Sequence, residues 1–105
     1  MRKILGFAST IVFVLTVVGM SVSAQGVDSA ALWKKTCAPC HKLDGKGGPM
    51  KTPDMTNKEW QSKRTDAQLI SVITGGEKMM PMFENKLKPE EIKALVSEVI
   101  RKFAQ

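Results

Sequence analysis

The hydrophobic residues near the C-terminal end follow the spacing of a helix. Apolar side chains recur every three or four positions and would form one stripe, made of Ile92, Leu95, Val96, Val99, Ile100 and Phe103. Pro89 suits the first turn of such a helix, and the two glutamates that follow it suit the positive end of the helix dipole. Arg101 and Lys102 suit the opposite end. We predict an amphipathic helix that begins at Pro89, although Lys88, at the capping position, supplies no side-chain acceptor.

Two capping boxes predict helices in the middle of the chain. Thr65 and Gln68 frame one such box, followed by the apolar residues Leu69, Ile70, Val72 and Ile73. Gly75-Gly76 would end this helix, with one glycine in the left-handed conformation. Thr56-Asn57-Lys58-Glu59 has the same form and predicts a short helix that includes Trp60, packed in the core.

The remaining pattern predicts one more helix and several loops. Asp28 or Ser29 would cap a first helix that buries Leu32 and Trp33. The glycines and proline of 44–49 predict a loop, and Pro81 disfavours helix at the residue before it. Because no convincing strand follows residue 30, we expect an all-α domain with long loops.

The first 24 residues have the features of a secretory signal peptide. Arg2 and Lys3 give a positive start, residues 4–18 are almost wholly apolar, and Val22-Ser23-Ala24 offers a small-residue cleavage site. We predict cleavage before Gln25 and one domain over 25–105. The alternative is an uncleaved membrane anchor, since apolar residues continue to about position 20. Either way, the two cysteines of the chain would face a non-cytoplasmic, oxidising compartment, which is the periplasm in bacteria.

The most informative motif is the run C-A-P-C-H, made of Cys37, Cys40 and His41. C-x-x-C-H is typical of covalent haem attachment, because positions i, i+3 and i+4 share one face of a helical turn. Two thiols there can bond the vinyl groups of a porphyrin while the imidazole binds iron. A zinc site would need a fourth ligand, and the chain has no other Cys or His. A redox disulfide with a surface His41 is the remaining alternative.

Methionines are the main candidates for a sixth iron ligand. With one His in the chain, bis-His ligation from this polypeptide is excluded, which leaves Met, Lys, an N-terminal amine or an open site. We interpret Met50 and Met55 as core residues. The segment Met79-Met80-Pro81-Met82-Phe83 lies between two predicted helices, about 40 residues after His41, where a loop can cross the haem. A thioether there would raise the reduction potential and exclude small ligands.

The formal net charge of +6 falls to +4 without the signal peptide, since 14 basic and 10 acidic residues remain. Lysines flank both the haem motif and the methionine-rich segment: Lys34, Lys35, Lys42, Lys46 and Lys51, then Lys78, Lys86 and Lys88. They are either an ordinary solvated face or a cationic ring that steers an acidic redox partner. Nucleic-acid binding is excluded, because the chain lacks interleaved aromatic residues and any recognition motif.

The haem motif, Met80-Pro81-Met82-Phe83 and the helix that opens at Leu87-Lys88-Pro89 together resemble the class I c-type cytochromes, and most closely the small bacterial periplasmic monohaem members. The resemblance covers 28–103 and implies a cytochrome c-like fold of four to five helices, with the first helix packed across the last. It implies Met80 as the axial thioether, with Met79 or Met82 as alternatives. It also implies that a proline carbonyl accepts the axial His ring N–H, with Pro53 first and Pro49 second.

We therefore expect an electron carrier with one covalent haem c, cycling between Fe(III) and Fe(II), and not an enzyme. The alternatives are a haem enzyme or gas sensor with an open or displaceable sixth ligand, and a membrane-tethered subunit of an oxidase or dehydrogenase. The former would want a distal acid–base group, which no second His provides. The latter would need an uncleaved N-terminal segment.

Overall fold

The computed structural model describes residues 26–105 together with Gly6 and Val12. The predicted signal peptide and its cleavage site lie outside the described residues, apart from those two positions. In the described part of the chain no helix is both long enough and apolar enough to cross a membrane. The same part is helical, with a single isolated bridge between Glu77 and Met80 in place of any strand, so the all-α prediction is confirmed.

The predicted C-terminal helix runs through three consecutive segments, α5 (Pro89–Ala94), the π-helical η3 (Leu95–Ile100) and the 3-10 helix η4 (Arg101–Ala104). Its predicted stripe faces the core: Ile92, Leu95, Val96 and Ile100 are buried, and Val99 and Phe103 are half-buried. Pro89 begins the helix as expected. The Lys88 side chain does not cap the helix. Instead, the Lys88 amide donates to the Glu91 carboxylate at 2.8 Å, so the backbone N–H at the capping position has a partner.

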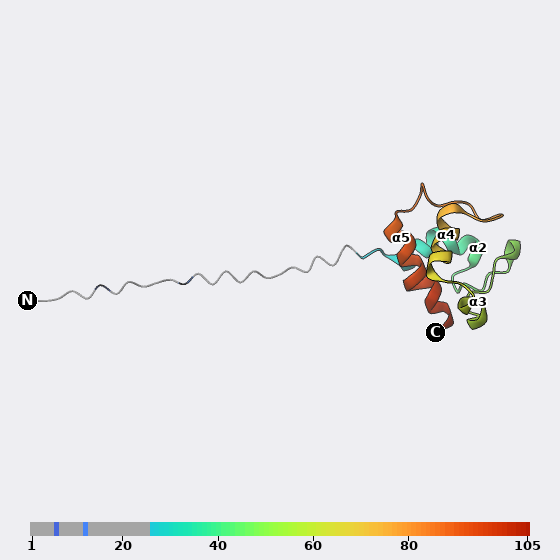
Figure 1. Ribbon diagram of the computed structural model, residues 1–105, viewed down its shortest axis with the longest axis horizontal. Coiled ribbons are helices and arrows are strands. Elements are labelled where there is room, and N and C mark those ends of the chain that lie inside the picture. The colour runs from blue at the N-terminus through green and yellow to red at the C-terminus, as the bar shows by residue number, and fades with distance from the viewer. Residues whose placement is uncertain (1–5, 7–11, 13–25) are drawn as a thin grey trace, which may run out of the picture.

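The N-terminal helix is likewise segmented into α1 (Ser29–Leu32), the π-helical η1 (Trp33–Cys37) and α2 (Ala38–His41). Asp28 caps it by accepting from the Ala31 amide at 3.1 Å. The segment lies against η3, where the Ser29 hydroxyl donates to the Glu98 carboxylate at 2.6 Å. The predicted packing of first helix on last is therefore confirmed, and Figure 1 shows the cyan start of the domain beside the red C-terminal helix.

Two short helices complete the core. The capping box of α4 (Asp66–Gly75) forms as predicted between Thr65 and Gln68. Gly76 ends that helix with φ of 75°, a sign of φ that glycine adopts freely. The cap of α3 (Lys58–Ser62) is Asn57, one residue later than the predicted Thr56.

Thr56 is not free to cap because it is bonded to Asp54. Its hydroxyl and its amide both donate to the Asp54 carboxylate, at 2.5 and 2.9 Å. These hydrogen bonds, the hydroxyl first, lower the pKa of Asp54. Asn57, one position on, then accepts from the Trp60 amide at 3.0 Å and starts the helix. The competing Asx turn explains the shift of one residue.

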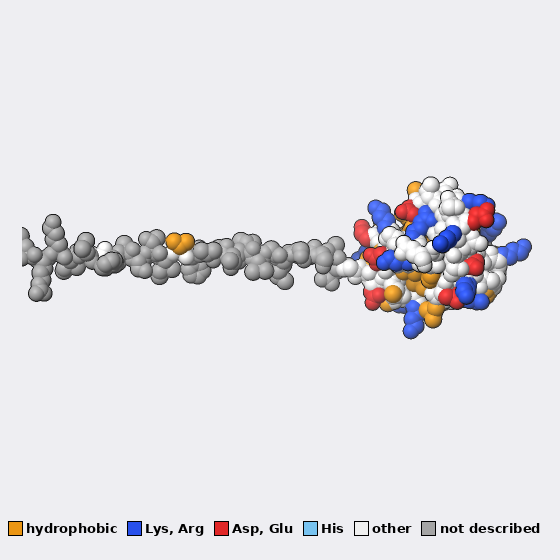
Figure 2. Space-filling view, turned by 90° about the horizontal axis from the view of Figure 1, so that it is seen from below, with side chains coloured by type: hydrophobic (Ala, Val, Ile, Leu, Met, Phe, Trp, Pro, Cys, Tyr) orange, Lys and Arg blue, Asp and Glu red, His pale blue; other side chains and the backbone are white. Residues whose placement is uncertain are grey.

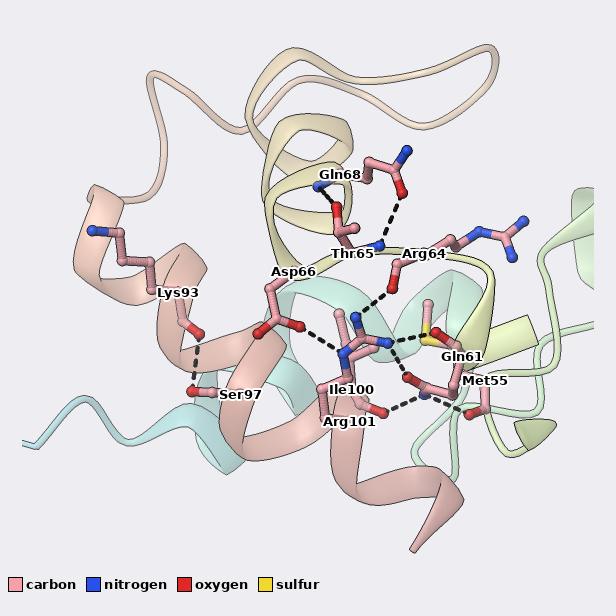
Figure 3. Close-up of polar contacts among 10 residues, drawn as sticks. All are labelled: Met55, Gln61, Arg64, Thr65, Asp66, Gln68, Lys93, Ser97, Ile100 and Arg101. Atoms are coloured by element: carbon pink, nitrogen blue, oxygen red, sulfur yellow. Dashed lines mark hydrogen bonds and ion pairs between the residues drawn. The ribbon is translucent and has the colours of Figure 1, made fainter. Parts of the chain in front are cut away.

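A buried amide joins the last helix to α3. The Gln61 side-chain nitrogen donates to the carbonyls of Met55 (2.8 Å) and Ile100 (2.7 Å), and its oxygen accepts from Arg101 at 2.8 Å (Figure 3). The Arg101 guanidinium also donates to the Arg64 carbonyl and the Asp66 carboxylate. Arg101 was expected to serve the helix dipole; the structure instead uses it to satisfy carbonyls at the end of α3.

The hydrophobic core includes Trp33, Cys37, Met55, Leu69, Ile73, Phe83, Leu87 and the buried residues of the C-terminal stripe. Met55 is 6% exposed, as predicted for a core residue. The same prediction for Met50 is wrong: it lies in the short η2 (Pro49–Lys51) with φ of 52° and is half exposed. A loop of glycines and lysines surrounds it, which leaves no packed surface to cover its side chain. Trp60 is half-buried at the edge of this core, with the Arg64 guanidinium 4.3 Å from its ring.

Candidate functional site

The three residues of the haem motif lie on one turn of helix next to the core. Cys37 ends the π-helical segment η1 and is buried, whereas Cys40 and His41 belong to α2 and are half-buried and buried. Both thiols are free. The Ala38 amide donates to the carbonyl of Trp33, five residues back instead of four. The helical turn that leads from Trp33 to Cys37 is therefore one residue wider than an α-helical turn.

Burial keeps the side chains of Cys37 and His41 uncharged. It raises the pKa of the Cys37 thiol to about 11 and lowers the pKa of His41 below its ordinary value. At neutral pH Cys37 is therefore a thiol and His41 a neutral imidazole, the form in which a ring nitrogen has a free lone pair for iron.

His41 also has an unsatisfied atom. Its Nδ1 is buried and has no hydrogen-bond partner among the described residues. The hydrogen bond predicted from this ring to the Pro53 carbonyl is therefore not formed in the structure. Two reduced thiols, a buried neutral imidazole and a buried ring nitrogen in need of an acceptor fit a covalently attached haem better than they fit a disulfide or a surface histidine.

The carbonyl of Pro53 nevertheless lies close to the chain that follows His41. The Gly47 amide donates to the His41 carbonyl at 3.1 Å. A Cβ added at Gly47 would lie 2.4 Å from the Pro53 carbonyl oxygen, and φ at this glycine is 64°. Only glycine allows the two segments to approach this closely. Pro49, the second choice, opens η2, and its carbonyl accepts from the Thr52 hydroxyl at 2.8 Å.

The residue after the motif has a strained backbone. Lys42 has φ of 65° and ψ of 160°, a combination that glycine adopts readily and that costs other residues on the order of 1–3 kcal/mol. Its carbonyl accepts from the Trp33 indole Nε1 at 3.1 Å and from the Gly45 amide at 3.2 Å. The sequence identified Trp33 as a core residue, and its role as a donor was missed.

The methionine-rich loop between α4 and α5 folds back on the end of α4. The Phe83 amide bonds the Ile73 carbonyl at 3.0 Å, and the Glu84 amide bonds the Thr74 carbonyl at 3.1 Å. Glu77 and Met80 bond one another through both backbone groups. A Cβ at Gly76 would lie 2.8 Å from the Met80 carbonyl oxygen, so this glycine permits the fold-back. The loop is non-helical at Met80, as predicted (Figure 1).

The three methionines of this loop differ in how deeply they are buried. Met80 is half-buried and packs against the core cluster, in which Phe83 is buried. Met79 is 70% exposed and Met82 is 52% exposed. An iron ligand must lie inside the protein, so this difference favours Met80.

The predicted cationic residues are all exposed: Lys34, Lys35, Lys42, Lys46, Lys51, Lys78, Lys86 and Lys88. Four large apolar side chains in the same two loop regions are exposed with them: Leu43, Met50, Met79 and Met82. On the face of the domain in Figure 2, a small apolar area lies among basic side chains, with acidic side chains between them.

The fold and the site define a class I c-type cytochrome. A solved structure, the KustC0563 c-type cytochrome, is 36% identical in sequence and superimposes with a TM-score of 0.71, covering 75% of this chain and 100% of that chain. The cytochrome c6 of the diatom Phaeodactylum tricornutum superimposes with a TM-score of 0.58 at 26% identity, over 75% of this chain and 98% of that chain.

Residues 24–97 match the family described as cytochrome C oxidase, cbb3-type, subunit III, and the chain belongs to this family. It is 38% identical over 76 residues to the cbb3-type cytochrome c oxidase subunit FixP of Bradyrhizobium sp. (strain ORS 278), covering 68% of this chain but 26% of that protein. It is 30% identical over 84 residues to the cytochrome c6 of Nostoc sp. (strain PCC 7120), covering 78% of this chain and 75% of that protein. The chain thus spans about a quarter of FixP and most of cytochrome c6.

As a member of this class, the protein carries a single covalently attached haem c and transfers electrons. These findings confirm the fold, the cofactor and the general function predicted from C-A-P-C-H and the methionine loop.

Proposed function

We propose that the protein is a periplasmic electron carrier whose haem is bound through Cys37 and Cys40 and ligated by His41 and Met80. The observation that carries the proposal is the pairing of a buried, neutral His41, one step after two free thiols, with the one methionine of its loop that packs on the core. When bound, the haem supplies a one-electron Fe(III)/Fe(II) couple, and a soft thioether ligand favours the reduced form.

His41 requires an acceptor for its second ring nitrogen to hold one orientation. We assign this role to the Pro53 carbonyl, with Pro49 as the alternative. The support is that the Pro53 carbonyl contacts Gly47, and that the Gly47 amide is bonded to the His41 carbonyl. Such a hydrogen bond would fix the ring and raise its basicity.

Met80 would supply the second iron ligand and so exclude water and small ligands. The fold-back of its loop onto α4 holds the sulfur without a contribution from Met79 or Met82, which point to solvent. A haem held by His41 and Met80 would change oxidation state without losing a ligand, so little reorganisation would be needed. The chain requires no substrate site and no catalytic residue.

The partners we propose are redox proteins with acidic docking faces. The exposed lysines around the motif and the methionine loop would accelerate encounter, and the exposed apolar side chains among them would make a small, transient contact. The family match and the likeness to FixP favour a cbb3-type cytochrome c oxidase as the electron acceptor. Whether the protein is free or tethered depends on cleavage of the predicted signal peptide over 1–24.

The experiment is a mass and an absorption spectrum of the purified periplasmic protein. We expect a covalent haem adduct that Cys37→Ala/Cys40→Ala lacks, and in the oxidised protein a weak far-red band from sulfur-to-iron charge transfer. Single substitutions Met79→Leu, Met80→Leu and Met82→Leu should abolish the band for Met80 only. A high-spin spectrum, or rapid carbon monoxide binding by the reduced wild type, would instead indicate an open sixth site.

A further inference from the structure

Trp33 makes an unusual link between the core and the residue next to His41. Its side chain is 3% exposed, and its indole N–H donates to the Lys42 carbonyl at 3.1 Å. Lys42 directly follows His41 and has the strained backbone described above. A tryptophan at this position therefore does more than fill space, since phenylalanine would pack similarly but has no donor.

We propose that Trp33 is a positioning residue for His41: its indole N–H holds Lys42 at positive φ and so fixes the direction of the His41 ring. The proposal rests on the proposed function, in which His41 ligates iron. Without the indole bond, one of the two hydrogen bonds to the Lys42 carbonyl is lost. Lys42 would then relax toward negative φ, because its side chain disfavours the observed conformation.

The Trp33 ring also connects the ligand to the C-terminal helix. Its centroid lies 5.8 Å from that of His41 and 5.1 Å from that of Phe103. Phe103 in turn packs on Gly45, where an added Cβ would come within 2.6 Å of the phenylalanine ring. The Gly45 amide gives the second hydrogen bond to the Lys42 carbonyl. The Lys42 carbonyl is thus held from two sides. Trp33 donates to it directly, and Phe103 packs on Gly45, whose amide donates to it.

The test uses the oxidised holoprotein and its haem methyl resonances in proton NMR, whose spread depends on the direction of the axial imidazole plane. Trp33→Phe removes the donor and keeps an aromatic ring. Trp60→Phe is the matched control, because Trp60 is a half-buried tryptophan on α3 and forms no side-chain hydrogen bond with the described residues. We expect a changed methyl pattern for Trp33→Phe and the wild-type pattern for Trp60→Phe.

The second variant tests the mechanism. Glycine at position 42 adopts positive φ without strain, so Lys42→Gly should make the indole bond unnecessary. We expect Lys42→Gly alone to keep the wild-type pattern, and Trp33→Phe/Lys42→Gly to recover it. If Trp33→Phe yields too little holoprotein, the double variant should restore the yield. A purely structural role for the indole ring would not be relieved by a glycine at another position.

Three results would overturn the proposal: a wild-type methyl pattern in Trp33→Phe, no recovery in the double variant, or no holoprotein from either. Failure of the proposed function is distinguishable from these. In that case the wild-type protein itself would lack the resonances of a histidine-ligated, low-spin haem, whatever residue stands at position 33.

Discussion

Gln61→Ala should destabilise the domain more than alanine substitution of any other asparagine or glutamine among the described residues. The Gln61 amide makes three hydrogen bonds and is 8% exposed. Its loss leaves the Met55 and Ile100 carbonyls without this donor, while Arg101 keeps its bond to the Gln61 backbone carbonyl at 2.8 Å. At about 1 kcal/mol for each bond, the variant should lose about 3 kcal/mol of unfolding free energy.

The assay is thermal and urea unfolding of the oxidised holoprotein, followed by circular dichroism. For a domain of this size, a loss of about 3 kcal/mol corresponds to a fall in Tm of roughly 12–24 °C, with an unchanged urea m-value. Gln68→Ala is the matched control. Gln68 is exposed and gives up one bond to the Thr65 amide, so we expect a loss of at most about 1 kcal/mol. Equal losses for the two variants would refute the reasoning.

Three further predictions concern the loop, acid stability and the cofactor. Gly47→Ala should destabilise the holoprotein and shift its reduction potential, because the added Cβ would clash with the Pro53 carbonyl. The control Gly75→Ala, with no atom within 4 Å of the added Cβ, should be neutral or stabilising. Similar reduction potentials and melting curves for the two variants would contradict this prediction. The hydrogen bonds of Asp54 lower its pKa, so its carboxylate stabilises the folded state above pH ~4, and this stabilisation is lost as the pH falls through the lowered pKa. In Asp54→Asn, the midpoint of urea unfolding should therefore fall less steeply with decreasing pH than in the wild type. Cys37→Ala/Cys40→Ala, which has no cysteine left to bond the haem, should lack native helix content, and a native circular dichroism spectrum would show that the fold needs no haem.

Local signals predicted the helices well because each signal acts over a few residues. The Thr65 capping box, the start at Pro89 and the end at Gly76 all depend on neighbouring backbone groups, and all are found. The cap of α3 was wrong by one residue because Asp54 competes for Thr56. Apolar periodicity also gave no sign of the π-helical segments, since one widened turn keeps the same side chains near the core.

The site was predictable where chemistry is carried by a motif and not where it depends on contacts between distant segments. Cys37, Cys40 and His41 are adjacent, so their grouping follows from the sequence. The family resemblance implied Met80 but left Met79 and Met82 open, and the burial that favours Met80 depends on how the loop folds back on α4. The strained backbone after the motif and its indole donor could not be predicted, because neither residue type is distinctive alone.

The contact between the first and last helices joins residues far apart in the chain. Ser29 and Glu98, which hydrogen-bond across it, are separated by 69 positions. Closing a loop of that length costs roughly 4 kcal/mol of chain entropy before any contact compensates it. Since the covalent attachment site lies in the last turns of the first helix, an attached porphyrin would give the collapsing chain an apolar surface from the outset. Folding speed, and not only final stability, should therefore depend on when the haem is attached.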